Sequence, residues 1–336
     1  MLIDNSRMRY TNERFLLIIL TLGIIILGIL IYRLSRLPSS VFLESFTVQN
    51  ELLQNQFKQD KIAFLFLTRN NLKRPEIWDK FLQGNESRYS IYCHPKEPEN
   101  VSNELLKKNI IPEHIDTCWS CINLVEANIL LMENALKDPQ NKKFILVSES
   151  CIPIVSFKIF YDMIMQNDKS RIGIHKINTT PDRYKDINNP VFPATEFIKH
   201  CGSGCIFNRK HASLLVKSKA TLEDWKTMQA ADEHYNGNIL RVLDKDFYSK
   251  DHTGFGVGGV APSNNDNIKT TFDIWQKDDL DKNTFAEDDI ETDSYILLKK
   301  LSNKAIDAIR KAGFAFVRKV DENTQIDDKY ILALSK

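Results

Sequence analysis

The chain has 336 residues, of which 43% are hydrophobic and 26% charged, and its 45 Lys and Arg against 44 Asp and Glu leave a formal charge of +1. This balance argues against a nucleic-acid-binding domain, which usually has a strong basic excess, and the many apolar residues exclude collagen-like and disordered chains. Six Cys in a chain of this length do not make a small disulfide scaffold, so a globular protein with a sizeable core remains.

The first predicted element is a membrane span at residues 15–32, FLLIILTLGIIILGILIY, which contain no charged side chain. A helix of this length reaches about 27 Å, close to the hydrocarbon thickness of a bilayer, and this favours a span over a buried core helix. Arg33 and Arg36 follow the run where a signal peptide would have small residues, so an uncleaved signal anchor is favoured. Three Arg precede the run and two follow it, which leans slightly toward a cytoplasmic N-terminus.

The span divides the chain into four predicted segments. They are a short cytoplasmic tail at 1–14, the transmembrane signal anchor at 15–32, a polar stem at 33–60 and one folded domain at 61–336. We therefore expect a single-pass type II membrane protein whose folded domain faces the lumen of the Golgi apparatus or the endoplasmic reticulum. Sequons at Asn85, Asn100 and Asn178 agree in number with chance, so they do not by themselves indicate a glycoprotein.

Strands alternate with helices from residue 61 onward. This pattern predicts an α/β fold in which a mostly parallel sheet is covered by helices on both faces. Ligands of such sheets bind beyond the carboxyl ends of the strands, where Thr68-Arg69 and Ser148-Glu149 lie. The predicted strands are 62–67, 89–93 and 144–147, and the predicted helices are 75–82, 122–136 and 157–165.

The six cysteines leave their chemistry open. Cys118-x-x-Cys121 together with Cys201-x-x-x-Cys205 could suggest a zinc site, although the second spacing is loose. Lumenal disulfides or plain buried thiols are favoured, and the sequence cannot choose among the possible pairings.

Several segments, taken in order, resemble the core-2/I-branching glycosyltransferase family, which includes branching N-acetylglucosaminyltransferases, peptide O-xylosyltransferases and plant and microbial relatives. The resemblance covers about residues 61–321 and rests on the order and spacing of the segments together. The segments are KIAFLFLTR at 61–69, IWDKFLQG at 77–84, YSIYCH at 89–94, WS at 119–120 before VEA at 125–127 and NAL at 134–136, FILVSESCIP at 144–153, GS at 202–203 before NRKHA at 208–212, DEH at 232–234 and FAFVRKV at 314–320.

The resemblance implies a GT-A-like, Rossmann-type fold and inverting transfer of a sugar from a UDP-sugar to a hydroxyl of a glycan or glycoprotein. The sugar would be of the GlcNAc or xylose class, and no metal ion or other cofactor is implied. Glu233 matches the family's general base, which must take a proton from the acceptor hydroxyl. From the residues alone, Glu233 is better interpreted as an exposed acid at a helix start, and the resemblance reverses that preference. The acceptor-binding candidates are Glu149, Ser203 and Asp232.

Without a metal ion, Lys or Arg must neutralise the charge that develops on the departing UDP. Lys319 matches a lysine of the family, and Lys269 is a second, weaker match. Arg318 is adjacent and is also a donor-binding candidate, although it would point elsewhere if this segment is a strand, because neighbouring side chains of a strand alternate. The remaining donor-binding candidates stand near strand ends and are Thr68, Arg69 and His94.

The chain departs from the family at two points. Gly204-Cys205 stands where many relatives have Gln-Trp, and His94-Pro-Lys96 stands where branching members often carry an Asp, so acceptor and donor identity do not transfer. Two other interpretations stay open. One is a catalytically silent, membrane-tethered relative that binds glycans. The other is a metal-dependent GT-A enzyme that uses Asp244 and Asp246, although we interpret this Asp-x-Asp as a solvated loop.

Overall fold

The computed structural model describes residues 59–175, 184, 187, 197–200, 204–247, 252–254, 269–273, 290–292 and 297–334, together with Thr21, Ile26, Gly28 and Tyr32. Contacts divide the chain into two units, Met1–Lys58 and Gln59–Lys336. Among the residues described, no helix is both long enough and apolar enough to cross a membrane. Apart from the four single residues, the predicted tail, the predicted anchor at 15–32 and the stem up to residue 58 lie outside the described residues.

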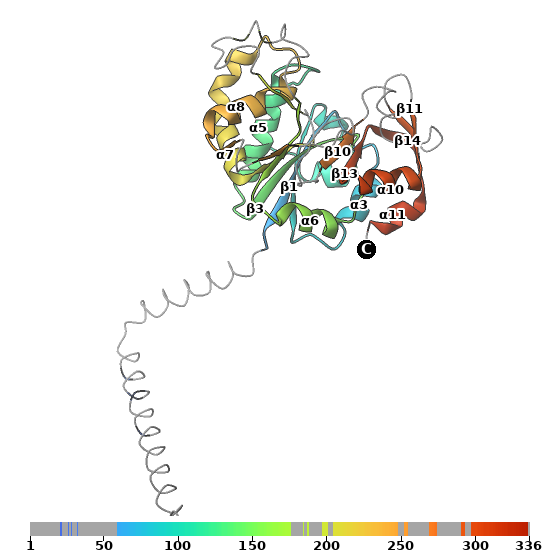
Figure 1. Cartoon of the computed structure of the whole chain (residues 1–336), viewed down its shortest axis with the longest axis horizontal. Helices are drawn as coiled ribbons and strands as arrows, with labels where there is room; N and C mark the ends of the chain where they lie inside the picture. Colours follow the sequence, from blue (N-terminus) through green and yellow to red (C-terminus); the bar gives the residue numbers. More distant parts are fainter. Residues whose placement is uncertain are drawn as a thin grey trace, which may run out of the picture. The chain divides into compact units, whose positions relative to one another are not determined.

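The second unit is built on a six-stranded sheet with helices on both faces (Figure 1). Its order is β2-β1-β3-β8-β5-β9, and β1 pairs in parallel with both β2 and β3. Thr68 is opposite Pro95, and Leu67 is opposite Ser148, so the carboxyl ends of these three strands meet at one edge. The strands are β1 (Lys61–Thr68), β2 (Tyr89–Pro95), β3 (Asn141–Ser148), β5 (Ser170–Ile172), β8 (Ile206–Asn208) and β9 (His252–Gly254).

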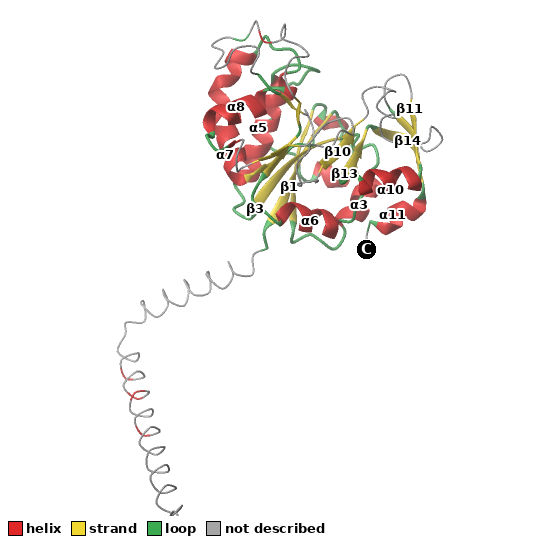
Figure 2. Ribbon diagram, viewed as in Figure 1, coloured by secondary structure: helices red, strands yellow, loops and turns green. Residues whose placement is uncertain are grey.

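The predicted α/β class is confirmed (Figure 2), and the central sheet is mixed, with five of its six strands in one direction and β8 against them. β8 runs antiparallel to both of its neighbours, β3 and β5. The regular strand–helix alternation continues to helix α6 (Phe157–Met165), after which come short strands and the antiparallel pair of β6 (Ile174–His175) and β7 (Lys199–His200). β3 ends at Ser148 and β8 begins only at Ile206, so the direction of β8 depends on long-range pairing that the local alternation does not predict.

Both faces of the central sheet are buried because successive side chains of a strand point to opposite faces. Ala63 and Leu65 of β1 belong to the apolar cluster that includes α5 and α7. Phe64 and Phe66 belong to the cluster on the other face, with α3 and α6. This explains the uninterrupted apolar run at 62–67. The helices are α3 (Pro75–Leu82), α5 (Asn123–Leu136), α6 (Phe157–Met165), α7 (Arg209–Lys217) and α8 (Tyr235–Leu243).

A three-stranded sheet brings the C-terminal region to the carboxyl edge of β3. Strand β13 (Phe314–Arg318) lies between β10 (Lys269–Asp273) and β4 (Ile152–Pro153), and β4 follows β3 almost directly. The Val320 N–H donates to the Ser150 carbonyl at 2.9 Å, and the Ile154 N–H donates to the Ala315 carbonyl at 2.7 Å. The end of β13 therefore lies beside the turn that follows β3.

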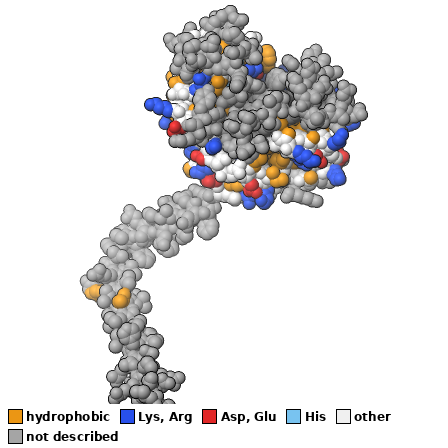
Figure 3. All heavy atoms as spheres, in the orientation of Figure 1, with side chains coloured by type: hydrophobic (Ala, Val, Ile, Leu, Met, Phe, Trp, Pro, Cys, Tyr) orange, Lys and Arg blue, Asp and Glu red, His pale blue; other side chains and the backbone are white. Residues whose placement is uncertain are grey.

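The remaining C-terminal elements have an apolar cluster of their own, which includes Leu298, Ile306, Ile309 and Val320. On the face shown in Figure 3, the positive and negative side chains of the described residues are interspersed, in keeping with the balanced composition. The other elements are η1 (Pro98–Asn100), α4 (Glu104–Lys107), η4 (Ser218–Trp225), η5 (Ala231–Glu233), β11 (Ile290–Thr292), β12 (Leu298–Leu301), α10 (Asn303–Lys311), β14 (Val320–Ile326) and α11 (Asp328–Ala333).

Candidate active site

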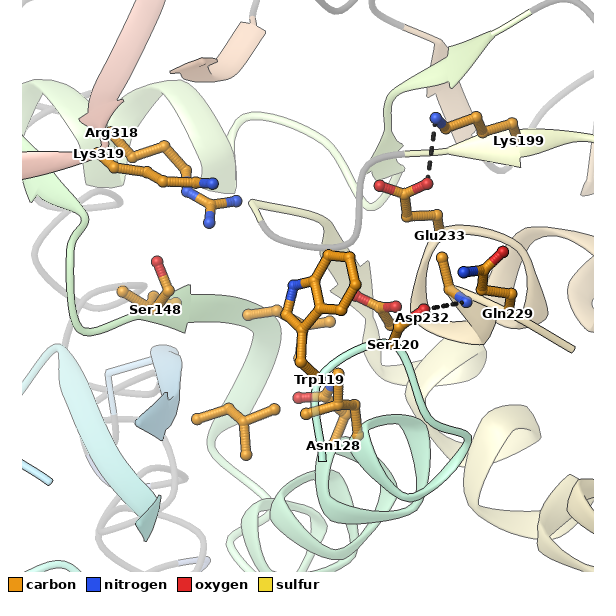
Figure 4. Close-up of a pocket in the computed structure, with 15 residues that line it drawn as sticks. Trp119, Ser120, Asn128, Ser148, Lys199, Gln229, Asp232, Glu233, Arg318 and Lys319 are labelled. Carbon is orange, nitrogen blue, oxygen red and sulfur yellow. Dashed lines mark hydrogen bonds and ion pairs between the residues drawn. The ribbon is translucent and has the colours of Figure 1, made fainter. Parts of the chain in front are cut away.

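A cavity of about 470 Å³ lies at the carboxyl ends of β1 and β3 (Figure 4). Leu67 of β1 and Val147 and Ser148 of β3 line it from the sheet. This is the edge at which open α/β sheets bind their ligands, and the volume is that of a small-molecule site. The charged residues in the lining are Lys199, Asp232, Glu233, Arg318 and Lys319.

Glu233 ends the short helix η5, which begins directly after a left-handed residue, Ala230. The Glu233 N–H donates to the Ala230 carbonyl at 3.0 Å, which fixes the backbone that carries the carboxylate. The side chain is 17% exposed, and its Oε2 lies 3.1 Å from Nζ of Lys199 in β7. The structure therefore presents a half-buried carboxylate, oriented by an ion pair, to the cavity.

Asp232 lines the same cavity, next to Glu233. Burial of the carboxyl, followed by the neighbouring charge of Glu233, raises the pKa of Asp232 to about 6, while Arg318 and Lys199 oppose the shift. A pKa shifted by burial and a specific charged neighbour is typical of functional sites.

Arg318 and Lys319 both line the cavity, on the side away from Glu233 in the view of Figure 4. The expectation that Arg318 would point elsewhere is wrong. Strand β13 ends at Arg318, so strand alternation does not extend to Lys319. The Lys319 carbonyl accepts the Leu298 N–H at 2.9 Å, and the bond from Val320 to Ser150 fixes the next residue. Two cationic side chains thus reach the end of β3 from a distant part of the sequence.

Lys199 and Trp119 are among the lining residues that were not predicted as site residues. Lys199 carries no sequence signal, because only the fold brings it to Glu233. Trp119 does have a sequence signal, because it lies between Cys118 and Cys121, which the structure joins in a disulfide.

Cys118 and Cys121 form a disulfide in this structure, so their sulfur atoms are not available as zinc ligands. Of the second proposed pair, Cys201 lies outside the described residues and Cys205 is a buried free thiol. Cys93 and Cys151 are also buried free thiols.

Three predicted residues, Thr68, Arg69 and Glu149, form with Glu97 what we call the strand-end cluster, and none of the four is in the lining of the cavity as described. Thr68 is buried and donates its hydroxyl to the Asn70 carbonyl at 3.1 Å. The Arg69 N–H donates to the Glu149 carboxylate, and Arg69 Nε lies 2.8 Å from Glu97 Oε1. Glu97 is the one member that the sequence did not single out.

His94 lies in β2 and is fully buried. Its Nε2 accepts the Ile115 N–H at 3.2 Å, and its ring stacks on His114 with centroids 5.1 Å apart. Burial, and then the adjacent His114, lower the pKa of His94, which favours the neutral ring. His94 packs in the core here and is not part of the lining of the cavity as described.

The described residues leave two other predictions untested, those for Lys269 and Ser203. Lys269 begins β10 opposite Phe314, four residues before the pairing of Asp273 with Arg318, and its side chain is not described. Ser203 lies outside the described residues.

Asp244 of the Asp-x-Asp segment is buried, and its Oδ2 lies 2.9 Å from both Lys210 Nζ and His211 Nε2. The prediction of a solvated loop is therefore wrong for Asp244, while Asp246 is exposed. Within the described ranges, no group of three or more His, Cys, Asp or Glu is arranged to hold a metal ion.

Comparison with known proteins gives a family, a curated relative and a solved structure. The family model described as Core-2/I-Branching enzyme matches residues 62–291, a segment that includes Glu233 and ends before Arg318. Glycosyltransferase BC10 of Oryza sativa subsp. japonica is 29% identical over 172 residues, which are 49% of this chain and 43% of that protein, so the chain spans less than half of that relative. The crystal structure of A197 from STIV is 12% identical, with a TM-score of 0.23, and the match covers 45% of this chain and 67% of that chain.

Proposed function

The chain belongs to the Core-2/I-Branching enzyme family of glycosyltransferases, and from this premise we propose that it transfers a sugar from a UDP-sugar to a hydroxyl of a glycan or glycoprotein. The transfer inverts the anomeric configuration, needs no metal ion and uses a sugar of the GlcNAc or xylose class. The observation that carries the proposal is that one cavity holds Glu233 together with Arg318 and Lys319. This pairs a candidate base with two candidate cations for a diphosphate.

In the proposed reaction, the Glu233 carboxylate accepts the proton of the acceptor hydroxyl as that oxygen attacks the anomeric carbon. A C–O bond to the acceptor forms, and the C–O bond between the anomeric carbon and UDP breaks. UDP leaves with the bonding electron pair. Attack from the face opposite the leaving group inverts the anomeric centre.

Arg318 and Lys319 stabilise the charge that accumulates on the leaving diphosphate. Hydrogen bonds between Arg or Lys and phosphate oxygens are charge-assisted and roughly twice as strong as neutral ones. Charged groups already in place where charge develops favour the transition state over the ground state. The pocket floor of Leu67, Leu146 and Val147 lowers the local dielectric and strengthens this interaction.

Lys199 is a positioning residue in this mechanism. Its ammonium group lies 3.1 Å from Glu233 Oε2 and holds this oxygen in place. The direction of the second carboxylate oxygen is thereby fixed as well. Proton transfer requires the base within hydrogen-bond reach of the hydroxyl, so a fixed carboxylate direction favours catalysis.

The same proposal includes a GT-A-like fold and a membrane anchor. The parallel β2-β1-β3 arrangement, with helices on both faces and a cavity at its carboxyl edge, supports the fold. The uncharged run at 15–32 supports a type II anchor that places the domain in the lumen of the Golgi apparatus or the endoplasmic reticulum. Alkaline carbonate extraction of membranes containing the full chain tests the anchor, and release into the supernatant would contradict it.

The activity is tested by UDP release from UDP-GlcNAc, UDP-xylose, UDP-glucose and UDP-galactose, with glycan acceptors and EDTA present. We expect turnover with at least one donor, and Glu233→Gln should lower kcat by about 100-fold or more. Glu223→Gln is the matched control, because Glu223 is exposed and pairs with Lys226 on the surface.

Three results would contradict the proposal. Equal turnover by the wild type and Glu233→Gln would remove Glu233 from its role. Activity lost in EDTA and restored by manganese would favour a metal-dependent enzyme. UDP and glycan binding without turnover would favour the catalytically silent relative.

A further inference from the structure

Trp119 is unusual among the tryptophans that the structure describes. Its side chain is 87% exposed, whereas Trp78 and Trp225 are buried in the core. It also lines the cavity that contains Glu233. In the view of Figure 4, its indole is directed into the space between Glu233 and the pair of Arg318 and Lys319.

The loop that carries Trp119 is fixed on both sides. The disulfide between Cys118 and Cys121 closes a turn around it. The next residue, Ser120, has a left-handed backbone, and its carbonyl and hydroxyl oxygens both accept the Ala230 N–H, at 2.9 and 2.8 Å. An exposed indole on so constrained a backbone offers an apolar face for which little backbone entropy is left to lose on binding.

The same contacts connect Trp119 to the proposed base. Ala230 donates to Ser120 and, through its carbonyl, accepts the N–H of Glu233 at 3.0 Å. Trp119 and Glu233 are thus carried by one hydrogen-bonded unit. Because Glu233 must contact the acceptor hydroxyl, the side of the cavity that Trp119 and Glu233 share is the acceptor side in the proposed reaction.

The surroundings match a sugar ring. A pyranose presents C–H groups on its faces and hydroxyls around its edge, so it requires an apolar plate bordered by polar groups. The amide side chains of Asn128 and Gln229 and the carboxyl of Asp232 line the same cavity and can bond edge hydroxyls. Aromatic side chains supply large and rigid contact area.

We propose that Trp119 is the platform on which a pyranose ring of the acceptor stacks, and that the acceptor of this chain is therefore a glycan rather than a bare peptide hydroxyl. This inference rests on the proposed function, because Glu233 defines the acceptor side.

The test measures binding and does not require turnover. Saturation-transfer NMR on the full chain, with UDP present, records the ring protons of a panel of methyl pyranosides (galactoside, glucoside and N-acetylgalactosaminide). We expect Trp119→Ala to lower the saturation transfer about fivefold or more, with Trp119→Phe within about twofold of the wild type. Ile159→Ala is the control, because Ile159 is an exposed apolar residue of α6 outside the described lining.

The affinity for UDP, measured by calorimetry, separates the two sides of the cavity. We expect it to change less than about twofold in Trp119→Ala. A parallel loss of UDP affinity would assign the indole to the nucleotide and overturn the proposal. So would equal saturation transfer in the wild type and Trp119→Ala, or no signal from any pyranoside. A Glu233→Gln variant with full turnover but normal saturation transfer would refute the proposed base and with it the assignment of the stacked ring to the acceptor, whereas the stacking on Trp119 itself would stand.

Replacing both cysteines tests the scaffold of the platform. Cys118→Ser with Cys121→Ser should weaken saturation transfer about two- to fivefold, because the free turn orders its backbone on binding. Unchanged saturation transfer in this variant, with Trp119→Ala still defective, would remove the disulfide from the proposal.

Discussion

Two groups of charged residues lie at the carboxyl edge of the same sheet and differ in how their charges are accommodated. In the strand-end cluster, hydrogen bonds from Asn100 and Arg69 lower the pKa of Glu97. In the cavity, burial and the nearby Glu233 carboxylate raise the pKa of Asp232 to about 6. The first group favours its charged forms through contacts within itself, whereas the second holds a carboxyl whose charged form is disfavoured.

This difference shows why a position at a strand end does not by itself identify a functional residue. The Arg69 N–H donates to Glu149 and so connects the loop after β1 to the loop after β3, and the Arg69 side chain donates to Glu97. Asp232, Glu233 and the cations across from them border open volume. A carboxyl whose pKa is raised beside a cavity indicates a functional site more strongly than a position at a strand end does. The predictions below compare the two groups, beginning with the largest expected effect.

The largest effect is expected at the cationic side of the cavity. Lys319→Ala removes a charge that the proposal places on the leaving diphosphate, so kcat for UDP release should fall about 100- to 1000-fold. Lys311→Ala is the matched control at the exposed end of α10 and should leave kcat unchanged. A loss of less than about threefold in Lys319→Ala would remove Lys319 from the mechanism.

The sequence predicts the elements near this site well and their assembly less well. The expected helices at 75–82, 122–136 and 157–165 agree with α3, α5 and α6 to within one residue, because local periodicity and the helix-stopping Pro signals determine them. The family resemblance is confirmed by the family match over 62–291. Local pattern carries no information on the antiparallel return of β8, which depends on long-range pairing.

The site itself was predictable in part for the same reason. Glu233, Asp232, Arg318 and Lys319 were all expected, and the structure brings these four together in one cavity. Lys199 was not expected, since its pairing with Glu233 depends on the β6–β7 pair and on η5. The roles of the strand-end cluster stay predictions, because sequence gives the position of a side chain along a strand but not whether its neighbours already satisfy it.

The second prediction concerns the stability effect of Asp232. In an unfolded chain an Asp carboxyl titrates near 3.9, and in this fold its pKa is about 6, so the stability of the wild type decreases as pH rises between these values. Asp232→Asn has no titrating carboxyl at this position, so its stability lacks this decrease with rising pH. We expect the difference in free energy of unfolding to move by about 2 kcal/mol in favour of the variant between pH 4 and pH 7.5, measured by urea unfolding. A pH-independent difference would contradict it.

The third prediction separates positioning from binding. Lys199→Met removes the ammonium that holds Glu233 and should lower kcat about tenfold with little change in the KM for the donor. Lys199→Arg keeps the charge and should recover most of that loss. If kcat stays at the wild-type value in Lys199→Met, or if the donor KM alone changes, Lys199 does not act through Glu233.

The smallest effect is expected in the strand-end cluster. The Arg69 side chain is 70% exposed and pairs with Glu97 at 2.8 Å, and such surface pairs contribute about 0–1 kcal/mol. Arg69→Ala should therefore leave kcat/KM for the UDP-sugar within about twofold of the wild type. Arg318→Ala is the same substitution on the cavity side and should lower it about tenfold or more. A tenfold rise in donor KM for Arg69→Ala would contradict this expectation. It would show that the nucleotide contacts the strand-end cluster, as the sequence alone predicts, despite the bonds within the cluster.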